Sequence, residues 1–466
     1  MDIGIKMNKK YFSKLAIAIL AHVATSPLFA ADLLDVWKSA QSKDPSYIAS
    51  RYEQMAGEKR RDQADSMFRP NIFVSATAGY MTSNSSTTGA QFYSSSMSGG
   101  PFNGSVFNTS VNGGTLTRHA VSAIQPVYNK ERSAQKSQLK TSSDLSDLVW
   151  QQAQHHLMIL VSERYFDVLK AEETLRLAKK QELAISQMYS EIKKRQQLGD
   201  AAQTDLQEAA QKMDATQVGI INAQMDLKVK KMALEDLMAG SSQIKHLSES
   251  IGLSSLNLES LEQYVSKMKS QNIGLKMAAL SQDIAKAESE KYDLLASPKV
   301  DVVAQTSRDH LSGSGDFGSG AGNTVTNHMV GVQLMVPLYT GGYRSAKYEE
   351  AILNLQKAKT NYDQVSLDAE KALRAIWLAL NSSKERIPAM IRAKETSQAR
   401  LRTTRSGHKV GARNTLELLG AEMDAVASEH ALFMEETNYL LNRLRLAAMV
   451  SELGESDLNS INAYLK

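Results

Sequence analysis

The chain has 466 residues, enough for two or three domains of ordinary size. It contains no cysteine, which excludes disulfides and attachment to a membrane through a lipidated cysteine. The 54 basic and 50 acidic residues leave a net charge of only +4. Because the charges nearly balance, they do not indicate nucleic acid as a partner.

The first 30 residues have the pattern of a secretory signal peptide. Three lysines precede or flank the start of an apolar run over 15–20, and small residues lead to a cleavage site after Ala30. The alternative is a membrane anchor, but His22 and Pro27 leave the apolar run too short to span a bilayer. Removing residues 1–30 takes away four lysines and one aspartate, so the net charge falls by three, from +4 to +1.

After the signal, short segments alternate between apolar and polar residues, as half-buried strands do. About ten residues is the length that a tilted strand needs to cross a bilayer, and no apolar stretch after the signal reaches 18 residues. The Gly/Ser/Asn-rich segments between paired strands, 81–116 and 310–324, are expected to be loops. The predicted strands cover about 71–80, 118–128, 298–308 and 326–338.

Long helices are expected between the strand pairs, because apolar residues there recur at three-and-four spacing. The first helix is predicted from about Lys130 to Leu198, roughly 100 Å at 1.5 Å per residue. The corresponding helix of the second half contains Pro388, which is expected to kink or break it.

The two halves of the chain have the same order of landmarks. Leu33 onward matches Leu261 onward at a shift of 228, and the same shift brings Pro70 onto Pro298. The sequence therefore predicts an internal duplication. Its expected divisions are a signal over 1–30, a first repeat over 31–240, a linker over 241–259, a second repeat over 260–454 and a C-terminal tail over 455–466.

Four strands are too few to close a barrel in lipid, where no sheet edge can be left without hydrogen-bond partners. About eight strands is the smallest common size. We therefore expect identical copies of the chain to complete one cylinder together. Tyr80, Tyr128 and Tyr339 lie near strand ends and are either interfacial aromatic residues or ordinary strand residues.

At this level of detail the chain resembles the TolC-like outer-membrane efflux proteins, over nearly all of the sequence that follows the signal. The resemblance rests on the segments "IQPVYNKE" and "MVPLYTGGYR" and on two glycine corners, at Gly199 and Gly411. It implies a mainly α-helical fold with a membrane β-barrel, in which three protomers share 12 strands and their coiled helices form a periplasmic tunnel. It also implies docking of a periplasmic adaptor protein and an inner-membrane ABC or proton-driven transporter, and location in the outer membrane of a Gram-negative bacterium.

The resemblance also assigns roles near the two corners, which are the turns between long helices and the expected adaptor-docking ends. Glu417 would contribute to a ring of carboxylates, which favours cations. A second acid ring of the family corresponds to Gly420 and is missing here. The alternative is that these charges are solvated helix-end residues, worth about 0–1 kcal/mol per pair. The residues implied for a tether that holds the tunnel mouth closed are Arg413, Asp205, Thr204 and His408.

No constellation for catalysis, a cofactor or a metal emerges, so the chain is not expected to be an enzyme. The leading hypothesis is an export channel for proteins, small molecules or both, and one sequence does not decide between these cargoes. The alternative is a structural or adhesive coiled-coil surface protein without a channel. That alternative does not explain the alternating segments or the absence of any charged residue from Pro70 to Thr117.

Overall fold

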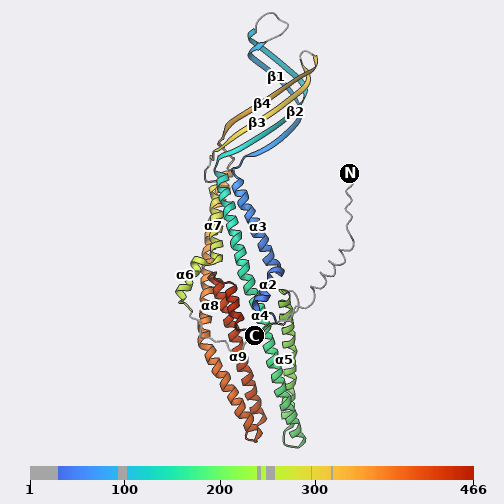
Figure 1. Cartoon of the computed structure of the whole chain (residues 1–466), viewed down its shortest axis with the longest axis vertical. Coiled ribbons are helices and arrows are strands. Elements are labelled where there is room, and N and C mark those ends of the chain that lie inside the picture. The colour runs from blue at the N-terminus through green and yellow to red at the C-terminus, as the bar shows by residue number, and fades with distance from the viewer. Residues whose placement is uncertain (1–29, 93–101, 239–242, 248–257, 295, 316–317) are drawn as a thin grey trace, which may run out of the picture. The chain divides into compact units, whose positions relative to one another are not determined.

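Figure 1 shows a computed structural model of the chain, which describes all residues except 1–29, 93–101, 239–242, 248–257, 295 and 316–317. The predicted signal peptide therefore lies outside the described residues, apart from Ala30. The first half contains α2 (Leu33–Lys43), α3 (Pro45–Ser66), β1 (Asn71–Phe92), β2 (Phe102–Asn129), α4 (Lys130–Gln197) and α5 (Gln203–Glu235). The second half contains α6 (Leu261–Gln271), α7 (Ile273–Glu290), β3 (Lys299–Gly315), β4 (Gly318–Met335), α8 (Tyr343–Lys409), α9 (Thr415–Met449) and α10 (Glu455–Asn462).

The element order confirms the internal duplication. Each half has a pair of helices, two strands and a long helical hairpin. Helices α2 and α6 each have 11 residues, and α4 and α8 have 68 and 67. Leu33 and Leu261 begin the equivalent helices, at the shift read from the sequence.

The chain folds into two compact units, and each takes segments from both halves. Among the described residues, the first contains those of 30–52, 150–273 and 366–466, and the second contains those of 53–149 and 274–365. The duplicated halves are thus interleaved rather than folded as separate domains.

The second unit contains one antiparallel sheet in the order β1-β2-β3-β4 (Figure 1). All four predicted strands are present, but their predicted extents are wrong. The β1–β2 pairing continues to Phe92 and Phe102, and the β3–β4 pairing continues to Gly315 and Gly318. Most of the residues expected in loops are therefore in strands, because ladder hydrogen bonds join backbone groups and do not require apolar side chains.

The two faces of this sheet differ in composition. Successive strand residues point to opposite faces, and partners in the register share a face. One face, called the apolar face below, exposes the side chains of Ile72, Val74, Val121, Val330, Val332 and Leu334. The opposite face, called the polar face, includes Ser75, Thr77, Ser122, Gln305 and the ion pair of Arg118 with Asp309, at 2.6 Å.

A buried arginine joins the ends of the strands to the helices of the second unit. The Arg344 side chain is only 8% exposed. Its guanidinium contacts the Glu131 carboxylate and the carbonyl oxygens of Lys291 and Leu294. Glu131 also accepts a 2.9 Å hydrogen bond from Lys299, the first residue of β3. This network fixes the position at which β3 begins relative to α4 and α8.

In the first unit, segments from both ends of the chain pack around α4. The Tyr165 hydroxyl donates to the carbonyl oxygen of Lys245 at 2.8 Å, and burial raises the pKa of this hydroxyl. Ala31 bridges to Ile244, and Leu247 bridges to Leu465, so the described part of the predicted linker pairs with both termini. The predicted C-terminal tail includes the helix α10.

The predicted limits of the first long helix are confirmed, since α4 runs from Lys130 to Gln197. Of the kink or break expected at Pro388, the break is wrong, because α8 continues through that residue; the kink stays a prediction. None of the helices that the structure describes is long and apolar enough to cross a membrane.

Candidate functional site at the two helical hairpins

The two glycine corners have the same backbone geometry. Gly199 and Gly411 have φ angles of +83° and +75°, a region that side-chain-bearing residues rarely adopt. At the first corner, the Asp200 N–H donates to the Arg195 carbonyl at 2.8 Å. At the second, the Ala412 N–H donates to the Gly407 carbonyl at the same distance. Both helices therefore end in a Schellman motif, with the glycine in the left-handed position.

The acids that follow the corners occupy equivalent positions in the returning helices. The Asp205 carboxylate accepts from the Ala202 N–H at 3.4 Å, and the Glu417 carboxylate accepts from the Asn414 N–H at 3.1 Å. The Asn414 side chain in turn accepts from the Glu417 N–H at 2.7 Å, which completes a capping box. The Asn414 N–H, and then Arg413, hold the pKa of Glu417 below its usual range. Glu417 is thus held ionised at the start of α9.

The chain itself does not join Arg413 to Asp205. Arg413 Nη1 contacts Glu417 Oε1 at 3.2 Å, one helical turn away, and the two side chains are 58% and 42% exposed. The Asp205 carboxylate instead accepts from the Ala202 N–H at the start of its own helix, and Thr204 is exposed. The local partners are nearer along the backbone than a partner across the two hairpins, so each charged residue pairs within its own corner.

A different contact links the first hairpin to the second. His408 Nε2 lies 3.3 Å from Glu191 Oε1 and 3.3 Å from Thr415 Oγ1. The Thr415 hydroxyl also donates to Glu191 Oε1, at 3.4 Å. Glu191 belongs to α4, His408 to α8 and Thr415 to α9, so this triad connects three helices. His408 therefore contacts both hairpins, and its role in a tether stays a prediction. Glu191 and Thr415 were not singled out by any sequence pattern.

Apolar packing supports the triad from within the first unit. Ile185 and Met188 of α4, Ala209 of α5 and Leu419 of α9 form a buried cluster. Tyr189 and Ile192 pack against it. The positions of Glu191 and Thr415 are therefore set by helices that pack together on apolar side chains.

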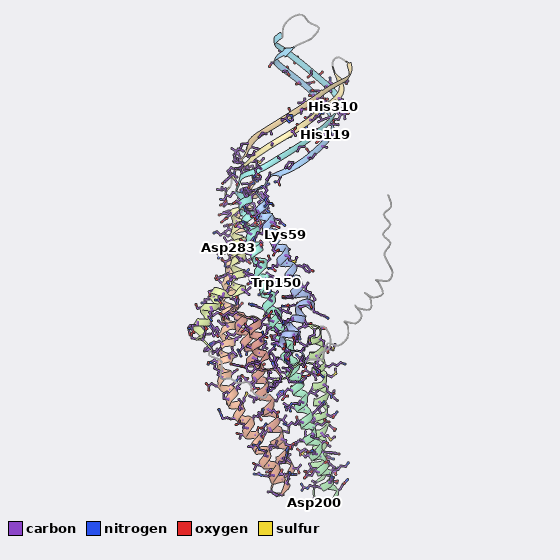
Figure 2. All side chains as sticks on the ribbon, in the orientation of Figure 1. Lys59, His119, Trp150, Asp200, Asp283 and His310 are labelled. Carbon is purple, nitrogen blue, oxygen red and sulfur yellow. The ribbon has the colours of Figure 1, made fainter. Side chains whose placement is uncertain are left out.

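Two grooves lie near these contacts. A groove of about 640 Å³ is lined by Glu191, His408 and Thr415, together with cationic and acidic residues of α4, α8 and α9. A second groove, of about 310 Å³, is lined by Asp205 and Asn414. Figure 2 shows Asp200 at the corner between α4 and α5, which borders this second groove. Asp205 therefore lies close to the second hairpin although no hydrogen bond joins it to Arg413.

Further along the hairpins, salt bridges fasten α4 to α9. Glu429 accepts from Arg176 at 2.6 Å and from Lys180 at 3.0 Å. Burial alone would raise the pKa of Glu429, but the hydrogen bonds from Lys180 and Arg176 hold it below its ordinary value. Arg445 and Glu163 make another such bridge, at 2.6 Å.

Chemistry other than ionic contact is not evident at the hairpins. Within the described ranges, no group of three or more histidine, cysteine or acidic residues is arranged to hold a metal ion. The charged, open ends of the hairpins can attract ions and contact other proteins.

Comparisons with known proteins agree on one family. A family model described as "Outer membrane efflux protein" matches residues 36–240 and 264–452. The outer membrane protein TolC of Vibrio cholerae is 23% identical over 95% of this chain and 95% of its own length. The alkaline protease secretion protein AprF of Pseudomonas aeruginosa is 23% identical over 93% of this chain and 87% of its own length. The crystal structure of the outer membrane protein VceC from Vibrio cholerae has a TM-score of 0.69 at 14% identity and covers 91% of this chain and 96% of that chain.

Proposed function

This chain belongs to the outer membrane efflux protein family, and from that premise we propose that three copies assemble into one continuous export duct. The protein is an outer-membrane channel of the efflux or secretion type. Its relatives are channels rather than enzymes, and we propose that it likewise catalyses no reaction.

The observation that carries the proposal is the open four-stranded sheet. Among the described residues, β1 and β4 each pair on one side only. An edge without partners is not tolerated in lipid. Three copies would supply twelve strands, four from each chain, and close the cylinder. The apolar face would then meet lipid and the polar face would line the pore.

The proposed partners follow from membership of the same family. The ends of the hairpins, at Gly199 and Gly411, would meet a periplasmic adaptor protein, and an inner-membrane ABC or proton-driven transporter would supply the energy. Similarity to the protease secretion protein AprF supports a protein cargo, and the family description supports efflux of small molecules. Cross-linking in cells and identification of the captured inner-membrane protein would decide between these two cargo classes.

The proposed gate lies at the hairpins. Glu417 would provide one carboxylate per copy, and three of them would form a cation-attracting ring. Within each chain the triad of Glu191, His408 and Thr415 would hold the two hairpins together. Between neighbouring copies, Arg413 would reach Asp205 and Thr204 of the next chain. The exposure of all three side chains in the single chain supports such a contact.

The proposal is tested by purifying the protein from the outer membrane and measuring two properties. Native mass spectrometry should give the mass of three chains, and planar phospholipid bilayers should show ion conductance. A trimer without conductance would favour the structural or adhesive alternative. A single chain that stays in solution without detergent would overturn the proposed assembly.

A further inference from the structure

Four nitrogen-bearing side chains gather on the apolar face of the sheet. They are His119 of β2, Arg308 and His310 of β3, and His328 of β4. His119 is the register partner of Arg308, and His310 lies two residues further along the same strand. His328 is diagonal to Arg308 because its own partner is Thr306. Side chains directly opposite are about 5 Å apart and diagonal ones about 7–8 Å, so Arg308 lies at the centre and each histidine is one of its neighbours. His310 and His328 lie on opposite sides of Arg308 along the sheet.

The four side chains are exposed and can therefore contact a ligand. Figure 2 labels His119 and His310 on neighbouring strands of the sheet. Nδ1 of His310 lies 2.9 Å from the Thr324 hydroxyl, and Nδ1 of His328 lies 2.9 Å from the Thr306 hydroxyl. These contacts fix the two rings and leave their Nε2 atoms for a ligand.

No acidic side chain competes for the cluster on that face. Asp309 points to the polar face, where it pairs with Arg118. Asp301, on the same strand, is an even number of residues from Asp309 and shares the polar face. Within the described strands Arg308 is therefore the single formally charged side chain of the apolar face, and no ion pair neutralises it there.

The cluster lies where the apolar band of the sheet ends. Apolar residues occupy this face of β3 from Val300 to Ala304, and Arg308 follows about 26 Å along the strand from Val300, at ~3.3 Å per residue. With a strand tilt of about 40° this is roughly 20 Å along the membrane normal, near the height of the apolar band in outer-membrane barrels. Thr117 and Thr324 lie level with His310, and beyond the cluster the face carries Thr115 and Ser312.

Two tyrosines mark the same boundaries. Tyr128 is the register partner of Val300, near the helices, and Tyr80 is the partner of Thr115, beyond the cluster. Both lie on the apolar face and both are exposed. Aromatic side chains collect at the two interfaces of a membrane, so the cluster falls at the interface farther from the helices. An arginine is costly at the bilayer midplane and is tolerated at this depth, where lipid headgroups lie.

We propose that Arg308, His119, His310 and His328 form a binding site for the phosphate of a phosphorylated glycolipid in the outer leaflet. The inference rests on the proposed function in two respects, namely that the apolar face meets lipid and that the helices lie on the periplasmic side of the membrane. The guanidinium can donate two parallel hydrogen bonds to phosphate oxygens, and the imidazole nitrogens can donate further ones. The lipid's acyl chains would pack on Val121 and Val330 beside the cluster, an attachment that free phosphate lacks.

Native mass spectrometry of the detergent-purified protein, incubated with diphosphorylated lipid A, tests this site. The double variant Arg308→Gln/His310→Gln is expected to retain roughly tenfold less lipid, about the effect of one lost charge-assisted contact. Lipid A without phosphates should bind the wild type as weakly as diphosphorylated lipid A binds the double variant. The matched control is Arg118→Gln, which removes one arginine charge from the polar face, next to His119 in the chain. This variant should retain lipid as the wild type does.

Equal retention of diphosphorylated lipid A by wild type and double variant would overturn the inference. Complete displacement of the lipid by inorganic phosphate would assign the site to free phosphate and overturn the commitment to lipid. Conductance in phosphatidylcholine bilayers separates the lipid site from the proposed channel function. A double variant that conducts normally but loses lipid supports both proposals. A wild type that never conducts contradicts the channel function and leaves the result on lipid binding as it stands. His310→Gln alone keeps Arg308 and should give a partial loss, so the site stays testable if the double variant does not fold.

Discussion

At the scale of residues, the closed arrangement of the hairpins depends on which partner each charged group reaches first. Arg413 and Asp205 are satisfied within their own corners, at 3.2 Å and 3.4 Å. Glu191 and His408 meet across the hairpins, and His408 also contacts Thr415 of its own hairpin. His408 was assigned to a tether only through the resemblance to the TolC-like family. Glu191 was missed because α4 has several glutamates at unremarkable spacing, and only packing decides which of them faces the second hairpin.

We expect Glu191→Gln to open the channel. The substitution weakens the contacts to His408 and Thr415, and the loss of one partly exposed hydrogen bond is worth about 1 kcal/mol, or roughly a fivefold shift of a two-state equilibrium in each chain. Single-channel recordings in planar bilayers should therefore show a larger mean conductance. Glu182→Gln is the control, since it makes the same charge change on α4 and, among the described residues, Glu182 makes no hydrogen bond or salt bridge across the hairpins. Identical recordings for the two variants would remove the triad from the gate.

Arg413→Ala and Asp205→Ala are both expected to raise conductance if neighbouring copies pair these residues. Either substitution deletes one side of the proposed contact, whereas Asp214→Ala, an exposed position on α5, should leave the conductance unchanged. An effect of Arg413→Ala alone would point instead to its local pair with Glu417. If neither variant differs from the wild type, the proposed contact between copies is wrong.

At the scale of elements, the limits of the first long helix were predicted well, whereas the four strands were predicted too short. The apolar spacing of α4 is repeated over 68 residues, which leaves little doubt about its period or its limits. The outer parts of the strands are rich in glycine, serine and asparagine, a composition typical of turns. Their strand conformation comes from pairing with the neighbouring strand, which no local pattern reveals. The predicted kink or break at Pro388 is not a break, because a long, packed helix can absorb one missing hydrogen bond.

Gly199→Ala and Gly411→Ala are expected to destabilise the hairpins. A Cβ at either position meets no atom within 4 Å, so the cost is backbone strain in the left-handed region, about 1 kcal/mol or more. Gly420→Ala is the matched control, because that glycine lies inside α9, has equally open surroundings and should gain about 0.5–1 kcal/mol. Thermal unfolding followed by circular dichroism at 222 nm compares the three. Equal shifts would contradict the Schellman geometry at the corners.

The attachment of α4 to α9 should depend on pH through Glu429. Its pKa is lowered in the folded chain, so its contribution is present above the ordinary value of 4.5 and is lost as the pH falls through the lower, folded value. At pH 7, Glu429→Gln should cost about 1 kcal/mol of stability. The gap in melting temperature between wild type and variant should close as the pH is lowered below 4.5. A gap that persists in acid would show that packing, not charge, holds Glu429 against α4. The control is Glu395→Gln, at an exposed residue of α8, which should produce no gap.

At the scale of the whole molecule, one chain is only part of the functional unit. Its sheet has two edges that lack partners among the described residues and a face of exposed valine, isoleucine and leucine side chains. The sequence was sufficient to count four strands and to conclude that identical copies must join them. It was not sufficient to assign the faces, because a bulge between Pro126 and Tyr128 changes the alternation within β2.

Cysteine cross-linking between copies tests the central claim most directly. The chain has no cysteine of its own, so each introduced pair reports on one contact. One cysteine replaces Ala78 on β1, and the second is moved in turn along the apolar-face positions of β4, from Thr324 to Val332. If β1 of one copy pairs with β4 of the next, one or two of these positions will give covalent products on a non-reducing gel that end at the trimer. Absence of any intermolecular product across the series, or a ladder that continues past three chains, would contradict a cylinder closed by three copies.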